Sequence, residues 1–170
     1  MARTITFQGK PLTLTGTAPQ AGAAAPAFTV TSQDMKDVAL TDFKGKIKLI
    51  STFPSLDTPV CDLQVKEFNK HASSLSSDIA VIGISKDLPF AQKRFCSENG
   101  IKSETVLSDY KISSFGLAYG LLIEGLYLLA RAVIIIDKND IVQYFQVVGE
   151  LTNPPDYAGA LKALEKIAKK

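Results

Sequence analysis

Residues 47–85 read as a strand, a helix and a second strand, and this order constrains the fold more than any other part of the chain. The two strand segments, 47–53 and 79–85, are short, apolar and rich in β-branched residues, which is typical of strands buried on both faces. From residue 61 to residue 75, apolar side chains recur every three or four positions, as on one face of an amphipathic helix. Two strands joined through a helix pair in parallel, so the sequence predicts an α/β protein with a covered sheet.

The remaining segments extend this unit at both ends. Residues 4–15 alternate apolar residues and threonines around a Gly-Lys-Pro turn, which predicts a β-hairpin, and residues 18–26 predict a surface linker. Further strands are predicted at 28–31, 38–40, 132–137 and 141–148, a turn at 42–46, and helices at 89–99, 109–118 and 155–170. This order predicts one domain, 1–170, with a thioredoxin-like fold: a central mixed β-sheet flanked by helices, with residues 1–16 as an N-terminal hairpin extension.

Nucleic acids and membranes are not the expected partners of this chain. Its 19 basic and 17 acidic side chains are interspersed and give a net charge of only +2. Residues 1–6 lack the apolar core of a signal peptide, and no apolar run is long enough to span a bilayer, so the sequence predicts a cytoplasmic protein. The two cysteines, Cys61 and Cys96, form no Cys-x-x-Cys pair, and with a single histidine they do not suggest a metal site.

Cys61 lies where the first buried strand gives way to the helix. Pro54 stops the strand, and Pro59 suits the first turn of the helix. Asp57 or Thr58 is a natural N-cap. A thiol in this turn meets unpaired backbone N–H groups and the positive end of the helix dipole, which both favour the reactive thiolate. Free cysteines are also often inert core residues, so the position by itself leaves both interpretations open.

Three motifs resemble the peroxiredoxins, and the thiol peroxidase branch of that family in particular. The stretch Pro54-x-x-x-Thr58-x-x-Cys61, which reads Pro-Ser-Leu-Asp-Thr-Pro-Val-Cys, is similar to the family's peroxidatic signature. Residues 87–96, Asp-Leu-Pro-Phe-Ala-Gln-Lys-Arg-Phe-Cys, are similar to its resolving-cysteine helix, and residues 130–137 to its arginine-bearing strand. The opening hairpin and the closing helix fit the family's layout without carrying a motif.

The resemblance implies a thiol-dependent peroxidase that reduces alkyl hydroperoxides and hydrogen peroxide. Cys61 would attack the peroxide and become a sulfenic acid, while Thr58 would hydrogen-bond the thiolate or the peroxide. Arg131 would stabilise the thiolate and polarise the O–O bond, and Pro54 would limit access by water. Cys96 would then attack the sulfenic acid to give an intramolecular disulfide, a step that requires local unwinding because the two cysteines start on separate helices.

The resemblance also implies reduction by thioredoxin, a homodimer, and no bound cofactor or metal. The apolar residues between 117 and 129 suit the core or a dimer interface, or in part a pocket for organic hydroperoxides, and His71 is expected to be solvated. Two other functions stay open: a disulfide oxidoreductase of the same fold, which lacks its usual Cys-x-x-Cys here, and a non-enzymatic peroxide sensor or redox-switched binding protein. A permanent disulfide between the cysteines is disfavoured in a reducing cytosol.

Overall fold

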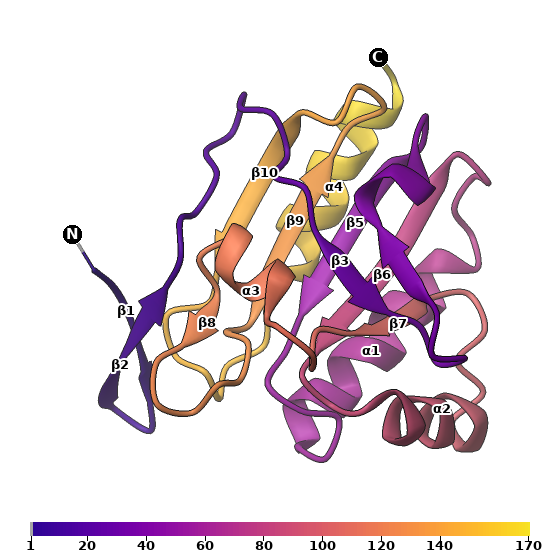
Figure 1. Ribbon diagram of the computed structural model, residues 1–170. Helices are drawn as coiled ribbons and strands as arrows, with labels where there is room; N and C mark the ends of the chain where they lie inside the picture. The colour runs from indigo at the N-terminus through magenta and orange to yellow at the C-terminus, as the bar shows by residue number, and fades with distance from the viewer. Residues whose placement is uncertain (1) are drawn as a thin grey trace.

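The structure, a computed structural model, describes residues 2–170 of the chain (Figure 1). Strands and helices alternate through most of this length, as the apolar periodicity predicts. In chain order the elements are β1 (Arg3–Phe7), β2 (Lys10–Thr15), β3 (Thr29–Thr31), β4 (Asp37–Ala39), the 3-10 helix η1 (Leu40–Phe43), β5 (Ile47–Thr52), α1 (Pro59–Ala72), β6 (Ile79–Ser85), α2 (Pro89–Glu98), β7 (Thr105–Ser108), α3 (Ser114–Ala118), β8 (Leu122–Ile123), β9 (Ala132–Ile136), β10 (Val142–Val147) and α4 (Tyr157–Ala168).

Within the described residues, seven strands form the central sheet in the order β10-β9-β5-β6-β7-β3-β4. Strand β6 pairs in parallel with β5 on one side and with β7 on the other. Strand β9 runs antiparallel to both β5 and β10. The sheet is therefore mixed, as predicted, and α1 makes the crossover that a parallel β5–β6 pair needs.

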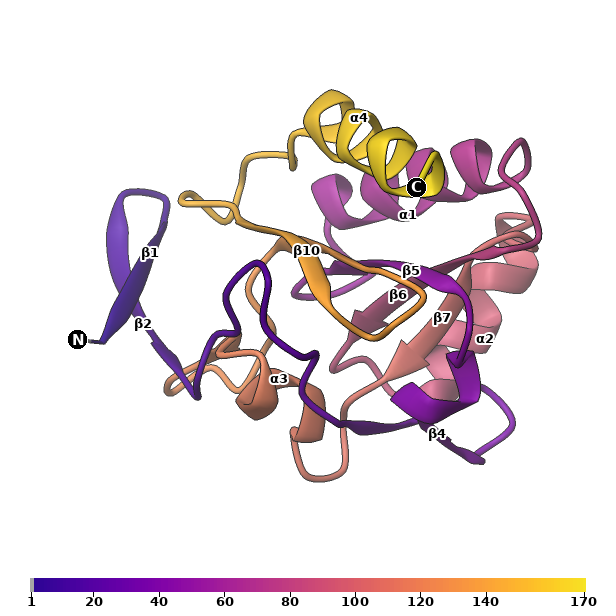
Figure 2. The ribbon, with the colours of Figure 1, turned by 90° about the horizontal axis from the view of Figure 1, so that it is seen from above.

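Side chains of the central strands alternate between two apolar layers. Leu49, Val81 and Val133 form one layer with Phe68 of α1 and Leu164 of α4. The alternate residues of the same strands join residues of α3 and its C-terminal end in the other layer: Ile50, Ile82, Ile134, Phe115 and Tyr119. Figure 2 shows α1 and α4 on one face of the sheet and α3 on the other. Coverage of both faces explains why these strands are largely apolar.

A smaller sheet contains the N-terminal hairpin, in which β1 pairs with β2 and β2 also pairs with β8. Gln8 and Gly9 form its turn with positive φ angles of 50° and 76°, a conformation that suits two-residue hairpins and that glycine adopts most easily. The Glu150 carboxylate accepts hydrogen bonds from Thr6 Oγ1 (2.6 Å) and from the Gln8 N–H (2.9 Å). These hydrogen bonds hold the pKa of Glu150 at about 2 and keep Phe7 beside the chain that follows β10.

The pairing register brings two distant segments to one edge of the central sheet. Thr52, the last residue of β5, lies opposite Ala132, the first residue of β9. The Cys61 loop, which we define as residues 53–58, therefore begins beside Arg131, the residue before β9. In α/β sheets, ligand sites lie outside the carboxyl ends of the parallel strands, and β5 and β6 both end at this edge.

Four segments differ from the sequence prediction. Strands β7 and β8 are not predicted, because four and two residues are too few to show an alternating pattern. The helix predicted at 109–118 is present only as α3, because Ser113 adopts a left-handed conformation with φ of 56° just before it. The turn predicted at 42–46 overlaps η1. All other predicted strands and helices are present, with bounds within about three residues of the predicted ones.

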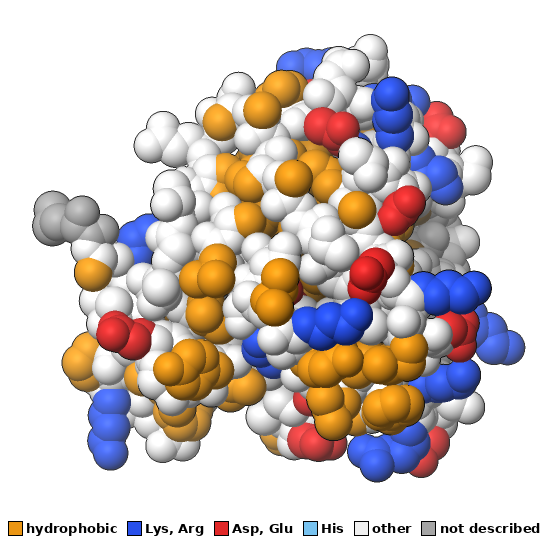
Figure 3. All heavy atoms as spheres, viewed as in Figure 1, with side chains coloured by type: hydrophobic (Ala, Val, Ile, Leu, Met, Phe, Trp, Pro, Cys, Tyr) orange, Lys and Arg blue, Asp and Glu red, His pale blue; other side chains and the backbone are white. Residues whose placement is uncertain are grey.

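Apolar side chains reach the surface in patches among the charged ones. Figure 3 shows two such patches, one near β8 and one near α2. The large apolar residues that are exposed are Phe7, Met35, Leu63, Leu88, Phe90, Ile112, Leu117, Leu126 and Tyr127. No helix within residues 2–170 combines the length and the apolar character needed to cross a bilayer.

Candidate active site

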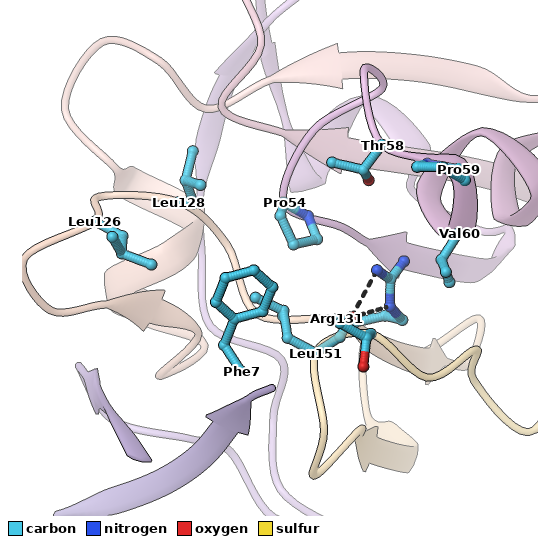
Figure 4. Close-up of a pocket in the computed structure, with 10 residues that line it drawn as sticks. Phe7, Pro54, Thr58, Pro59, Val60, Leu126, Leu128, Arg131 and Leu151 are labelled. Atoms are coloured by element: carbon cyan, nitrogen blue, oxygen red, sulfur yellow. Dashed lines mark hydrogen bonds between the residues drawn. The ribbon is translucent and has the colours of Figure 1, made fainter. Parts of the chain in front are cut away.

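A cavity of about 330 Å³ lies at the sheet edge where β5 ends and β9 begins. It is lined by Phe7, Pro54, Thr58, Pro59, Val60, Leu126, Leu128, Arg131, Leu151 and Thr152. Figure 4 shows Leu126 and Leu128 at one end and Pro59 and Val60 at the other. Three residues singled out by the sequence, Pro54, Thr58 and Arg131, therefore meet around one mostly apolar space.

Arg131 is the only charged residue that lines this cavity within the described chain, and its side chain is almost completely buried, at 2% exposure. Its Nε and Nη2 donate to the Leu151 carbonyl (3.2 and 2.9 Å), and its Nη1 donates to Gln64 Oε1 (2.8 Å). These three bonds leave two of the five guanidinium N–H groups unpaired. No carboxylate within residues 2–170 forms an ion pair with Arg131. A buried cation with neutral partners favours an anion beside it.

Gln64 positions this guanidinium, and sequence reasoning missed it. Its side-chain amide donates to the Thr52 carbonyl (3.1 Å) while its Oε1 accepts from Arg131. Gln64 is fully buried on α1, three residues after Cys61 and on the same helical face. The sequence does contain a signal for Gln64: it is a polar residue on the apolar face of the helix, and such a residue must find a buried hydrogen-bond partner.

Thr58 occupies the N-cap position of α1, but its hydroxyl does not cap the helix. The backbone is extended, as at most N-caps, while Oγ1 donates to the Ser55 carbonyl (3.0 Å) instead of accepting from a helical N–H. The donor of this hydroxyl is therefore satisfied within the Cys61 loop, and its lone pairs remain available to a hydrogen-bond donor in the cavity.

Cys61 is the third residue of α1 and has no exposed surface. It does not line the cavity, although its neighbours Val60 and Thr58 do. Its side chain belongs to a buried apolar cluster with Phe53 and Val65.

Cys96, on α2, belongs to the same apolar cluster as Cys61 but faces a different groove. Both cysteines are free thiols. Burial raises the pKa of the Cys96 thiol; a hydrogen bond from Gln33 Nε2 (3.4 Å) opposes this shift, and the nearby Glu104 carboxyl adds to it. At neutral pH Cys96 is therefore a protonated thiol in its resting position.

Glu104 is a buried carboxyl near the cysteine cluster that sequence reasoning also missed. Its exposure is 5%, and neither of its oxygens forms a hydrogen bond within the described chain. It occupies the space left by the missing side chain of Gly83, where a Cβ atom would lie 2.7 Å from Glu104 Oε1. Burial raises the pKa of Glu104 well above its usual range, against a smaller lowering by Ser51, because burial disfavours the charged form of the carboxyl.

Replacing Glu104 with glutamine is expected to stabilise the protein at alkaline but not at acidic pH. In the unfolded chain the carboxyl ionises near pH 4.3, whereas in the folded chain its pKa is raised. The wild type therefore loses stability as the pH rises from the unfolded to the folded pKa, by up to about 1.4 kcal/mol per pH unit, and the variant does not. Urea unfolding under reducing conditions at pH 4, 6 and 8 measures the difference in unfolding free energy between the wild type and the variant.

The matched control is Glu98→Gln, which alters an exposed carboxyl at the end of α2. This variant is expected to follow the wild-type pH dependence. A constant difference in unfolding free energy between wild type and Glu104→Gln across the three pH values would contradict a raised pKa of Glu104.

The other sequence expectations divide between core and surface. His71 is half-exposed, 3.7 Å from Glu67 on the same helix, and does not line the cavity. Of the apolar residues between 117 and 129, Leu121, Leu122, Ile123 and Leu129 are buried in the core, while Leu126 and Leu128 line the cavity. No group of three potential metal ligands occurs within residues 2–170.

The chain is similar to known proteins both in sequence and in structure. Residues 20–161 match the family model described as Redoxin. The thiol peroxidase of Halalkalibacterium halodurans is 50% identical over 94% of this chain and 95% of its own, and that of Bacillus subtilis is 46% identical over 97% and 98%. The crystal structure of a peroxiredoxin-like protein from Aquifex aeolicus superposes with a TM-score of 0.89 at 41% identity, covering 97% of this chain and 98% of the other.

Proposed function

Because this chain belongs to the redoxin family and is a thiol-dependent peroxidase of the peroxiredoxin type, we propose that Cys61 is the thiol that reduces the peroxide. Arg131, Thr58 and Pro54 complete the site around it. The observation that carries this proposal is the buried Arg131 guanidinium, which lines the cavity beside the start of α1. Within residues 2–170, two of its N–H groups are unpaired and no carboxylate forms an ion pair with it.

In the proposed reaction, the Cys61 thiolate attacks the terminal oxygen of the hydroperoxide. The O–O bond breaks, sulfur loses two electrons and becomes a sulfenic acid, and the departing oxygen takes up a proton to form an alcohol or water. The unpaired N–H groups of Arg131 stabilise the thiolate and the charge that develops on the departing oxygen. The lone pairs of Thr58 Oγ1 accept the hydroperoxide O–H, which orients the O–O bond.

Organic hydroperoxides are the proposed preferred substrates, with hydrogen peroxide also reduced. Apart from Arg131, Thr58 and Thr152, the cavity wall is apolar, and Phe7 from the N-terminal hairpin contributes to it with Leu126 and Leu128. An alkyl chain gains by leaving water for such a surface, whereas hydrogen peroxide has no apolar part to bury. Pro54, which is buried at the cavity, limits the access of water to the sulfur.

The sulfenic acid is proposed to react with Cys96. The Cys96 thiol attacks the Cys61 sulfur, its proton leaves with the sulfenic hydroxyl as water, and an intramolecular disulfide forms. A dithiol reductant, thioredoxin, then reduces this disulfide to two thiols.

Residues 1–170 are proposed to act as one domain, with 1–16 as its hairpin extension. This domain is proposed to form a homodimer through the apolar patch near β8 that Figure 3 shows. A cytoplasmic location remains a prediction.

Peroxide treatment of the Cys96→Ser variant tests this proposal. The variant is expected to take up one oxygen atom on Cys61 and then stop, because no second thiol can displace the hydroxyl. Intact-protein and peptide mass spectrometry detect the sulfenic acid after trapping with a dione reagent. The double variant Cys61→Ser/Cys96→Ser is the control and is expected to take up no oxygen.

Sustained turnover of Cys96→Ser with thioredoxin would contradict the role of Cys96. The thioredoxin-coupled turnover assay, applied to the wild type, also separates the alternative functions. A non-enzymatic sensor or redox-switched binding protein would form the disulfide once without catalytic consumption of peroxide, and a disulfide oxidoreductase would show no dependence on peroxide.

A further inference from the structure

The Asp87 carboxylate connects the Cys61 loop to the start of the helix that carries Cys96. Asp87 lies between the end of β6 and the start of α2. Its Oδ1 accepts from Ser55 Oγ (2.8 Å), and its Oδ2 accepts from the Leu56 N–H (2.9 Å) and from Ser85 Oγ (2.6 Å). Hydrogen bonds to an ionised acceptor are about twice as strong as those between neutral groups, so these contacts bind the loop firmly.

The network continues from Asp87 into α2. Ser85 Oγ also accepts from Gln92 Nε2 (3.1 Å), and the same amide donates to the Leu107 carbonyl of β7 (2.8 Å). Ser85 and Gln92 are completely buried. Gln92 lies four residues before Cys96, one helical turn away on the same buried face of α2. A continuous set of hydrogen bonds therefore joins the Cys61 loop to α2, the helix that carries Cys96.

The same contacts determine how α1 begins. The Ser55 carbonyl accepts a hydrogen bond from the Thr58 hydroxyl, and the Ser55 hydroxyl donates to the Asp87 carboxylate. The Thr58 N–H also donates to the Ser55 carbonyl (3.2 Å). Without Asp87, Ser55 would be free to move, and so would Thr58, which is hydrogen-bonded to Ser55 and lines the cavity.

We propose that Asp87 is a positioning residue of the peroxidase, which holds the Cys61 loop against the base of α2 in the arrangement that reacts with peroxide. This inference rests on the proposed roles of Cys61 and Cys96. The two chemical steps place opposite demands on the network. Peroxide reduction needs Thr58 and Arg131 correctly placed around the sulfur. Disulfide formation needs the two sulfurs about 2.05 Å apart, and both thiols are free in this structure, so at least one of the two cysteines must move. Asp87 therefore favours the first step and slows the second.

The test measures the two steps separately in Asp87→Ala, Asp87→Asn and Ser55→Ala. The chain has no tryptophan, so rapid quenching, thiol alkylation and mass spectrometry follow Cys61 oxidation and disulfide formation in single turnovers. The ratio of the disulfide-formation rate to the oxidation rate is expected to rise about tenfold in Asp87→Ala and about threefold in Ser55→Ala, which lose charge-assisted hydrogen bonds to different extents. Asp87→Asn keeps one acceptor oxygen and is expected to lie between the wild type and Asp87→Ala.

Asp34→Ala is the matched control. Asp34 pairs with Lys93 of α2 (3.2 Å) on the exposed side of the helix, so this variant removes an aspartate contact to α2 and none to the Cys61 loop. Its ratio is expected to equal that of the wild type.

A rise of less than about twofold in folded Asp87→Ala, equivalent to less than about 0.4 kcal/mol, overturns the inference. If Asp87→Ala does not fold, Ser55→Ala decides by the same criterion. A wild-type protein whose Cys61 is not oxidised would instead overturn the proposed function, so the two failures are distinguishable.

Discussion

Replacing Cys61 with serine is expected to abolish peroxide reduction, with a loss of at least about a thousandfold in kcat/KM. A serine hydroxyl remains protonated at neutral pH, and its oxygen cannot accept the peroxide oxygen to form the equivalent of a sulfenic acid. No histidine lies among the cavity residues to act as a general base for it. The measurement is the peroxide-dependent oxidation of NADPH, coupled through thioredoxin and thioredoxin reductase.

The exchange of sulfur for oxygen is nearly isosteric, and Cys61 is buried without exposed surface, so the variant should remain folded. A thermal unfolding midpoint close to that of the wild type checks this point. Cys96→Ser serves as the comparison, since it should consume one equivalent of peroxide where Cys61→Ser consumes none. Full turnover by Cys61→Ser would refute the proposed mechanism.

Replacing Arg131 with lysine is expected to lower the rate of Cys61 oxidation about a hundredfold, although the charge is kept. The guanidinium binds the Leu151 carbonyl and Gln64 Oε1 at once and still has two N–H groups to offer. An ammonium is a compact point charge with three donors, so it cannot serve both structural partners and the reacting atoms in the same way. Single-turnover oxidation at several peroxide concentrations measures the change.

Arg94→Lys provides the matched control, because Arg94 is an exposed arginine on α2 and should tolerate the same exchange. Urea unfolding separates a structural effect from a catalytic one: a destabilised but fully folded Arg131→Lys should still oxidise slowly. An oxidation rate within about threefold of the wild type would show that the geometry of the guanidinium is not needed.

Much of the fold follows from short-range patterns in the sequence. The apolar runs of β5, β6 and β9, the helical spacing after Cys61 and the alternating pattern of the N-terminal hairpin each depend on residues a few positions apart, and all are present in the structure. The hairpin turn lies at Gln8-Gly9, whereas the sequence placed it at Gly-Lys-Pro, because Lys10 and Pro11 belong to β2. Strands β7 and β8 escaped prediction because they are short and owe their conformation to neighbouring strands.

Some residues of the candidate site could likewise be predicted from the sequence, and others could not. Pro54, Thr58 and Cys61 lie within eight positions of one another, so their arrangement around a helix N-terminus is readable from the chain. Arg131 could be selected by its motif, but its approach to the Cys61 loop depends on the register that places Thr52 opposite Ala132. Gln64, Glu104 and Asp87 gain their importance only from their partners in space.

By itself, the sequence determined the α/β order of elements, the position of Cys61 at the start of a helix and the motifs that identify the family. Periodicity, capping and turn formation act between residues close in the chain, and so they leave a local record. Tertiary structure alone decided that Arg131 lines the cavity with no counter-ion among residues 2–170, that a buried carboxyl lies over Gly83, and that Asp87 joins the two cysteine segments. Burial and strand register depend on contacts between residues far apart in the chain, which no local pattern records.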